Sequence, residues 1–336
     1  MDNRFTKKRI TNMLSYDWIK MVIIILAIIF FWSLAYTIGA PRISPGQTFT
    51  VFYYTGNGAF NYLHTPEKMY QEINKKTPFS YDVLDFSYRE LTTDYFSEIM
   101  MTSMVSYEGD IMITIDSKDK IEKFGSEFRG VVDSYGEVMY SYDALVTDAK
   151  QYCLVNGLVY EKDGAYCLNE NKIAELFATR MVKDPRFRDK TGERYAKGVQ
   201  DEIARIKTLW NNAIILEDCL NAHPEIFVKY ARYQQAIGAA PNDYSDEAYK
   251  NQPEKIYAVN LGLLSGGEVN VASEFAYNIK DEKGEILSSS ADGIVMLVFN
   301  FKDEQPHLQY ETLTFVNGII GRYSNFLNYS ANGVIL

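Results

Sequence analysis

Histidine is scarce in this sequence, and the motifs of the common catalytic and cofactor sites are missing. The histidines at positions 64, 223 and 307 are isolated, with no second histidine at metal-site spacing. We find no His-Glu-x-x-His, Gly-x-Ser-x-Gly, P-loop or dinucleotide motif. Spacing alone does not test for a Ser-His-Asp triad. The neighbouring carboxylates Glu108 and Asp110 fit a helix-end turn better than an acid–base pair. We therefore expect no enzyme, no cofactor and no metal site.

Cysteine is also rare, with three residues in 336. None lies near the N-terminus, which excludes a bacterial lipoprotein anchor. No Cys-x-x-Cys occurs, which argues against structural zinc. Cys153 and Cys167 flank two short predicted strands, and a hairpin could join them as a disulfide outside the cell. The alternative for these two and Cys219 is buried free thiols that behave as small apolar residues.

Positive charge is in short supply after the first 20 residues. The formal net charge is −10, and residues 1–20 hold five basic and two acidic side chains, so the rest carries −13. This acidity argues against nucleic acid as a partner and against adhesion to anionic lipid, and solubility is its simplest explanation. The chain is 14% aromatic with 26 tyrosines, which is too aromatic for a disordered stalk.

One long hydrophobic run is present. Residues 21–40 carry no charge, and as a helix they would span ~30 Å, the thickness of a bilayer core. We therefore predict a transmembrane helix over 18–40 that contacts the lipid bilayer. A cleaved signal peptide is the alternative, but its apolar run is usually only about 7–15 residues long. The basic tail 1–17 predicts a cytoplasmic N-terminus at the cell membrane, a short linker over 41–47 and an extracellular C-terminal domain.

Strand and helix patterns alternate after the linker. Runs of β-branched and aromatic residues predict strands at 48–55, 81–88 and 111–115, with helices at 65–74 and 95–108 between them. The last of these strands is apolar throughout, as is typical of a strand buried on both faces. This order implies right-handed crossovers and a mainly parallel sheet covered by helices.

The middle of the chain is mainly helical, and strand patterns return at its end. Helical patterns lie at 171–180, 198–222 and 225–237. The intervening stretches 121–150 and 184–197 look irregular and loop-like. Strand patterns resume at 255, are strongest at 293–301, and precede a closing helix at 309–327. We therefore predict an α/β lobe from 48–118 plus 255–336, and a mainly helical second lobe from 119–254.

Three segments resemble the type 2 periplasmic-binding-protein fold of bacterial extracellular solute-binding proteins. They are TFTVFYYTG, YFSEIMMTSMVSYEGDIMITID and KIYAVNLGLL. In that family a helix ends in a short glycine-containing turn before a buried strand, and Glu108–Met112 fits this pattern. The closing GIVMLVFNF and its following helix are also similar, so the resemblance covers 48–118 and 255–327. It implies a two-lobed, non-catalytic α/β domain that binds a small solute or peptide in an inter-lobe cleft, with a membrane partner such as a permease.

Candidate ligand-binding residues follow the first three predicted strands, because ligands bind at the carboxyl ends of strands in open α/β sheets. Glycine lets a backbone approach a ligand closely, arginine can hold a carboxylate or phosphate, and tyrosine can stack on sugars or cations. The alternatives are that the tyrosine merely packs and that Arg89 makes a surface ion pair. The candidates are Tyr54, Gly56, Asn57, Gly58, Arg89, Asp116 and Ser117.

Two other functions stay open at this point. The chain could be a structural or assembly subunit of a bacterial membrane or envelope complex, because its domain lies close to the bilayer. An extracellular hydrolase is the third hypothesis, and it would need an acid, base or nucleophile clustered in a pocket.

Overall fold

The computed structural model forms two units, residues 1–42 and 43–336, which we describe separately. It describes residues 7–8, 11, 18–39, 48–54, 60–62, 71–73, 85–116, 127–180, 191–235, 249–251, 253–280, 286–301 and 310–335. The helix predicted at 65–74 therefore lies largely outside the described residues. Of the loop predicted at 184–197, residues 191–197 are described, and the prediction is wrong from Glu193 on, where the helix α8 (Glu193–Ala222) begins.

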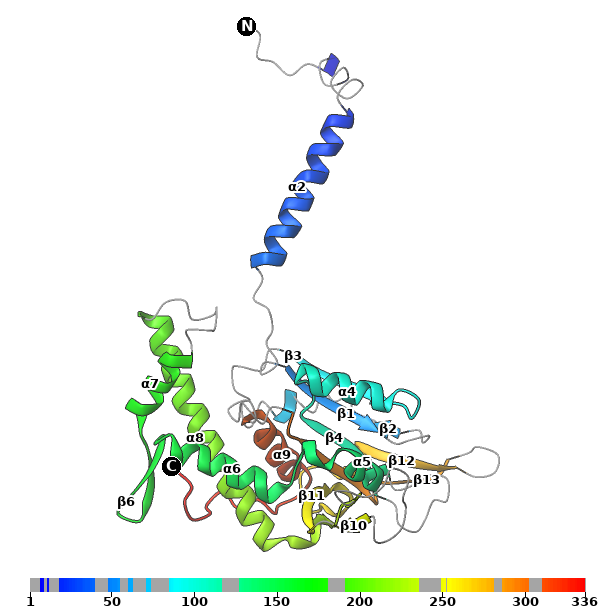
Figure 1. Ribbon diagram of the computed structural model, residues 1–336, viewed down its shortest axis with the longest axis vertical. Helices are drawn as coiled ribbons and strands as arrows, with labels where there is room; N and C mark the ends of the chain where they lie inside the picture. The colour runs from blue at the N-terminus through cyan, green and yellow to red at the C-terminus, as the bar shows by residue number, and fades with distance from the viewer. Residues whose placement is uncertain are drawn as a thin grey trace. The chain divides into compact units, whose positions relative to one another are not determined.

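The first unit contains one long apolar helix, α2 (Trp18–Gly39, 22 residues), in agreement with the predicted helix over 18–40. This helix is drawn in blue in Figure 1. Its side chains are exposed almost throughout, and Lys20 is its one charged residue. The segment Trp18–Thr37 is long and apolar enough to cross a membrane. A signal sequence near the N-terminus can also be long and apolar enough to do so, so this property does not separate the two alternatives.

A seven-stranded mixed sheet forms the centre of the second unit, with the order β3-β1-β4-β14-β11-β8 and β5 paired to β14. Its strands are β1 (Thr48–Tyr54), β3 (Asp85–Leu91), β4 (Ile111–Ile115), β5 (Met139–Tyr140), β8 (Phe227–Tyr230), β11 (Lys255–Asn260) and β14 (Ile294–Phe299). β1 is parallel to β3 and to β4, whereas β14 is antiparallel to β4, β5 and β11, and β8 is antiparallel to β11. Five of the seven strands thus run in one direction, so the sheet is mostly parallel, as expected.

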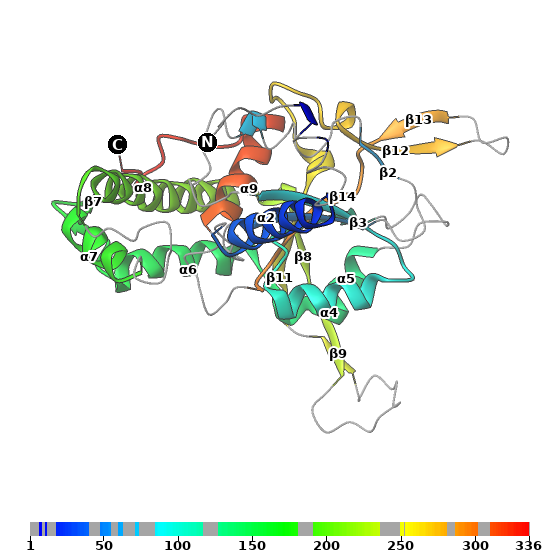
Figure 2. The ribbon, with the colours of Figure 1, turned by 90° about the horizontal axis from the view of Figure 1, so that it is seen from above.

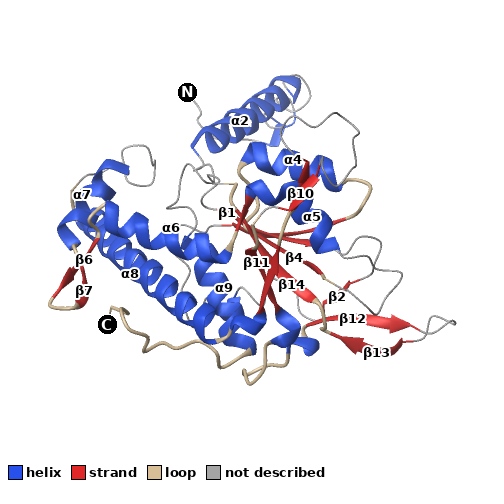
Figure 3. Ribbon diagram, turned by 60° about the horizontal axis from the view of Figure 1, so that its bottom comes forward, coloured by secondary structure: helices blue, strands red, loops and turns tan. Residues whose placement is uncertain are grey.

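Helices cover both faces of this sheet (Figure 3). In β1, the side chains of Phe49, Val51 and Tyr53 join one buried cluster, and those of Phe52 and Tyr54 join a second cluster on the opposite face. The first cluster includes residues of α6, α8 and α9, and the second includes residues of α4 and α5. The central strands are therefore apolar throughout because both of their faces are buried.

The helices of the second unit agree with the sequence patterns in part. They are α4 (Phe96–Ser106), α5 (Glu127–Tyr135), α6 (Tyr142–Val155), α7 (Glu170–Arg180), α8 (Glu193–Ala222) and α9 (Tyr310–Tyr323), with short 3-10 helices η2 (Gly136–Val138), η5 (Pro224–Ile226), η6 (Leu261–Leu263) and η7 (Val271–Ser273). The helices predicted at 95–108, 171–180, 198–222 and 309–327 are confirmed. All of α5 and most of α6 lie where the pattern looked irregular, at 121–150.

The helix predicted at 225–237 is wrong. Residues 224–226 form a 3-10 turn, and the chain then enters β8, which pairs with β11. The paired residues of β11 lie 25 to 32 positions further along the chain, from Tyr230 with Lys255 to Phe227 with Val259. A local pattern does not report such a distant partner, and the sheet overrides the helical preference of this stretch.

A two-lobed arrangement is not confirmed. Residues 43–336 form one compact unit, and one hydrophobic cluster contains both sheet residues and residues of α6 and α8. The stretch predicted as a second lobe, 119–254, therefore shares its core with the sheet (Figure 2).

The described residues also form three smaller sheets. They pair β2 (Phe60–Tyr62) with β12 (Phe275–Lys280) and β13 (Ile286–Ser290), β9 (Tyr233–Gln235) with β10 (Tyr249–Asn251), and β6 (Val159–Lys162) with β7 (Ala165–Leu168). The last pair is the predicted hairpin. Its two turn residues, Asp163 and Gly164, both have positive φ (53° and 79°), as a tight hairpin turn requires.

The structure has no disulfide between Cys153 and Cys167, so this alternative is corrected. All three cysteines are free, and Cys153 and Cys219 are buried. Cys153 lies inside α6 rather than at the start of a strand, and Cys167 pairs with Tyr160 across the hairpin. Burial raises the pKa of the Cys153 thiol to about 12. Burial, reinforced by Asp218 and Glu225, raises the pKa of the Cys219 thiol to about 12.

We expect a single thiol of the folded chain to react with Ellman's reagent at pH 8. Cys167 is half-buried, whereas Cys153 and Cys219 are enclosed and stay protonated, and the thiolate is the reactive form.

Because the folded pKa of each buried thiol lies above its unfolded value, its stabilising effect is complete below about pH 9 and is lost as the pH rises toward 12.

The matched control for this labelling is Cys167→Ser, which should abolish the reaction of the folded chain. Denaturant should then restore two reactive thiols. Rapid reaction of Cys153 or Cys219 in the folded chain, or a bridge found by non-reducing electrophoresis, would contradict the free, buried thiols.

Candidate functional site

The candidate site lies at the carboxyl edge of β1 and β4. The first three strands of the large sheet stand in the order β3-β1-β4, so β1 has its chain successors on opposite sides. Such a position is a topological switch point, and ligands of open α/β sheets bind outside the strand ends there. Tyr54 ends β1 and Asp116 follows β4, so the fold brings these two predicted residues to one edge.

Aromatic rings form one part of this edge. The ring of Tyr54 stacks on Phe96, the first residue of α4, with 4.1 Å between centroids, and Phe96 meets Tyr135 of α5 edge to face at 5.6 Å. The Tyr54 hydroxyl also hydrogen-bonds with Glu127 and Thr93. Burial, followed by the charge and hydrogen bond of Glu127, raises the pKa of Tyr54 above its usual value.

Charged side chains of α5 form the other part. Arg129 Nε lies 3.5 Å from Asp116 Oδ1, and its guanidinium sits 5.5 Å from the centroid of the Tyr230 ring. The Tyr230 hydroxyl donates to Asp133 Oδ2 at 3.0 Å. Burial raises the pKa of Tyr230 to about 12, helped by Asp133, so this phenol stays protonated and donates at neutral pH. The Arg129 cation thus contacts the Asp116 carboxylate at the end of β4 and an aromatic face at the end of β8.

Arg129 has unused hydrogen-bonding capacity. Its Nε is buried and has no hydrogen-bond partner in the described part of the chain, because the contact with Asp116 has ion-pair but not hydrogen-bond geometry. A guanidinium with free donors can grip a carboxylate or phosphate with two parallel bonds. The sequence analysis missed Arg129 because it did not predict α5. An acidic residue in the first turn, Glu127, followed by apolar residues is the pattern that could have indicated this helix.

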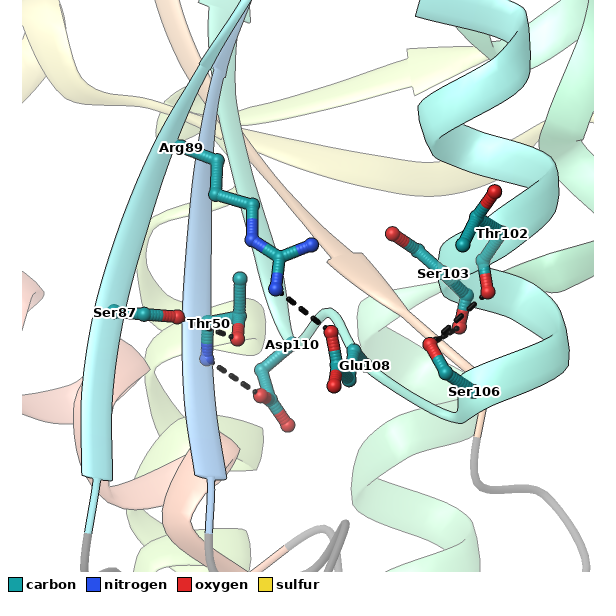
Figure 4. Close-up of polar contacts among 8 residues, drawn as sticks. All are labelled: Thr50, Ser87, Arg89, Thr102, Ser103, Ser106, Glu108 and Asp110. Carbon is teal, nitrogen blue, oxygen red and sulfur yellow. Dashed lines mark hydrogen bonds and ion pairs between the residues drawn. The ribbon is translucent and has the colours of Figure 1, made fainter. Parts of the chain in front are cut away.

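Arg89 does not join this cluster and instead pairs with Glu108 (Figure 4). It lies inside β3 beside Phe52, and its Nη2 donates to Glu108 Oε2 at 2.8 Å. Glu108 precedes β4, so the guanidinium points toward the amino edge of the sheet, away from Asp116. Both side chains are partly exposed. Arg89 therefore makes a surface ion pair, which the sequence analysis gives as the alternative to ligand binding.

The carboxylate of Asp110 binds the backbone at the same amino edge (Figure 4). Its Oδ2 accepts from the Thr50 amide at 2.9 Å, and its own amide donates to the Thr50 carbonyl at 3.0 Å. The Thr50 hydroxyl lies 2.9 Å from that of Ser87. Asp110 thus extends the pairing of β1 with β4 by one residue. This structural role agrees with the interpretation that Glu108 and Asp110 belong to a turn at the end of a helix.

The other predicted site residues, Gly56, Asn57, Gly58 and Ser117, lie outside the described residues. Within the described ranges, no group of three or more His, Cys, Asp or Glu side chains is arranged to hold a metal ion. No family model, curated protein or solved structure matches this chain, so its function has to be argued from its own geometry.

Proposed function

We propose that this protein is a membrane-anchored, non-catalytic binding protein that captures a small polar solute at the carboxyl edge of β1 and β4. One observation carries the proposal: the switch point of the sheet coincides with the end of β1 at Tyr54 and with the Arg129–Asp116 ion pair after β4. Because this edge is where open α/β sheets bind ligands, a cluster of mixed charge and aromatic faces there is suited to recognition.

The anchor in this proposal is α2. It is uncleaved, spans the bilayer, and leaves the basic N-terminal tail in the cytoplasm, which places residues 43–336 outside the cell. The length of the helix, its single charge near one end and its exposed apolar side chains support this role. The resemblance to solute-binding proteins points the same way, with a permease as the natural membrane partner.

Arg129 is the residue that we expect to select the solute. A solute with a carboxylate or phosphate would accept from the guanidinium, and hydrogen bonds to charged groups contribute about 1.5–3 kcal/mol each. Asp116 and Glu127 would contact any amine or hydroxyl on the same molecule, and the ring of Tyr54 would pack against its apolar part.

The test is a thermal-shift screen of the full chain in detergent micelles against amino acids, short peptides, sugars and phosphorylated metabolites, followed by calorimetry. We expect a carboxylate- or phosphate-bearing compound to raise the melting temperature. Arg129→Ala should then weaken its binding by roughly 10- to 100-fold, from the loss of one charged hydrogen bond.

Arg89→Ala is the matched control, because it removes a partly exposed, ion-paired arginine from the same sheet but from the opposite edge. It should leave the affinity unchanged. Equal binding by the wild type and Arg129→Ala would refute the site, and a complete screen without any shift would refute solute capture itself.

A further inference from the structure

The outer side of α4 carries an exposed apolar patch, which we define as Met101, Val105 and Tyr107. Their exposed fractions are 65%, 82% and 41%. Of the 11 residues of α4, Glu98 alone is charged. In a surface helix the apolar side chains normally face the core, whereas these three face outward. The inner side of α4 is covered by the sheet, whereas these three side chains stay exposed beside the described residues.

The patch adjoins the amino edge of the sheet. α4 ends at Ser106, the next residue, Tyr107, takes the left-handed conformation (φ 57°), and the chain then turns through Gly109 to Asp110. Asp110 bonds to Thr50, the third residue of β1. The exposed end of α4 therefore lies beside the point where the chain enters the domain (Figure 4).

The chain length limits how far this edge is from the anchor. Eight residues separate Gly39, the last residue of α2, from Thr48, the first of β1. At full extension a stretch of this length spans only about 30 Å. If α2 lies in a bilayer, the amino edge of the sheet is therefore confined to the neighbourhood of that bilayer.

The charges around the patch favour contact with a lipid surface that has no net charge. Glu108 is neutralised by Arg89 at 2.8 Å, and Glu98 adds one negative charge near the other end of the patch. The last turn of α4 has no basic residue. Anionic lipid would therefore be repelled by the acidic domain, whereas zwitterionic lipid accepts methionine, valine and tyrosine side chains at its interface.

We propose that the patch of Met101, Val105 and Tyr107 rests on the zwitterionic lipid surface of the membrane that holds α2. This inference depends on the anchor in the proposed function. The contact turns the amino edge of the sheet toward the bilayer. Because β1 runs from that edge to Tyr54, the carboxyl edge with Arg129 then faces the solution, open to an incoming solute.

The test uses the full chain with Cys167→Ser, reconstituted into phosphatidylcholine nanodiscs. A single NBD fluorophore is attached through Val105→Cys or, as the control, Val155→Cys. The two valines are matched, because Val155 ends α6 in the helical part of the domain and is 83% exposed against 82% for Val105. Melting temperatures of both labelled chains should equal that of the parent, since both sites are on the surface.

We expect the label at position 105 to emit at shorter wavelength and to lose most of its emission to doxyl-labelled lipid, with the label at position 155 unaffected. Exchanging part of the lipid for phosphatidylglycerol should weaken this quenching. Water-like emission at both positions in a chain that co-elutes with the nanodiscs overturns the lipid contact and leaves the anchor intact.

Two further outcomes also overturn the contact. Blue-shifted emission at position 105 that resists the lipid quencher and grows with the number of chains per disc assigns the patch to a second copy. Failure of the chain to co-elute with nanodiscs refutes the anchor in the proposed function, and the lipid contact with it.

Discussion

Replacing Arg322 with alanine is expected to lower the free energy of unfolding by about 3–5 kcal/mol, the typical effect of removing one partner from a buried ion pair. Arg322 Nε donates to Glu274 Oε2 at 2.9 Å, and its Nη2 donates to the other carboxylate oxygen at 2.5 Å. Its Nη1 pairs with Glu72, and the Tyr323 hydroxyl also donates to Glu274. The side chains of Arg322 and Glu274 are only 10% and 5% exposed, so alanine would leave a buried carboxylate without its cation.

These contacts join three distant parts of the chain, so their loss should lower the stability of the whole second unit. Glu274 follows η7, Arg322 and Tyr323 end α9, and Glu72 belongs to the short described segment 71–73. Urea unfolding of the full chain in micelles, followed by circular dichroism, measures the change. Because α2 stays in the micelle, the transition reports mainly on residues 43–336.

Arg89→Ala is the control for this measurement, because the Arg89–Glu108 pair is largely exposed and such pairs contribute about 0–1 kcal/mol. The double variant Arg322→Met with Glu274→Met should recover much of the lost stability, because it removes both buried charges together. Glu72, at 40% exposed, can then turn to water. A loss for Arg322→Ala no larger than that for Arg89→Ala would contradict the buried-pair account.

The parts of the fold that the sequence predicts well are those set by local pattern. The continuous apolar run of β4 was found at its observed bounds, 111–115, and β1 and α4 within two residues of theirs. β1 and β4 are short apolar runs, and a central strand buried on both faces is the arrangement that removes such a run from water. The direction of β14 was not predictable in this way, because an apolar strand reads the same whether its neighbours are parallel or antiparallel.

The sequence predicts only those residues of the candidate site that lie at the ends of strands. Tyr54 and Asp116 end or follow strands whose bounds were right, so their common edge could be foreseen. Arg89 was misplaced because its strand was expected over 81–88, whereas β3 continues to Leu91 and keeps Arg89 inside the ladder. Arg129 was missed because α5 has only nine residues, one of them a glycine, and tertiary packing rather than propensity forms such a short helix.

Replacing Trp210 with alanine should also lower the free energy of unfolding by about 3–5 kcal/mol, as is usual for a fully buried tryptophan. Trp210 lies in the middle of α8 and is completely buried. Its ring packs against Tyr166 of β7 with 4.7 Å between centroids, and its Nε1 donates to the Gly333 carbonyl at 2.8 Å. Alanine would leave a cavity between α8, the β6–β7 hairpin and the C-terminal segment, and would leave the Gly333 carbonyl without this donor.

Trp210→Phe separates the two contributions, because phenylalanine keeps most of the ring volume but cannot donate to Gly333. A lost hydrogen bond of this kind is worth about 0.5–1.5 kcal/mol, so this variant should be much less destabilised than Trp210→Ala. Asn211 holds the C-terminal segment independently, since its side-chain amide donates to and accepts from the backbone of Ile335, both at 2.8 Å. Hydrogen exchange at residues 331–335 should therefore rise only modestly in Trp210→Phe and steeply when Asn211→Ala is added. Equal stability of the alanine and phenylalanine variants would show that the hydrogen bond to Gly333, and not the buried ring, fastens the C-terminal segment to α8.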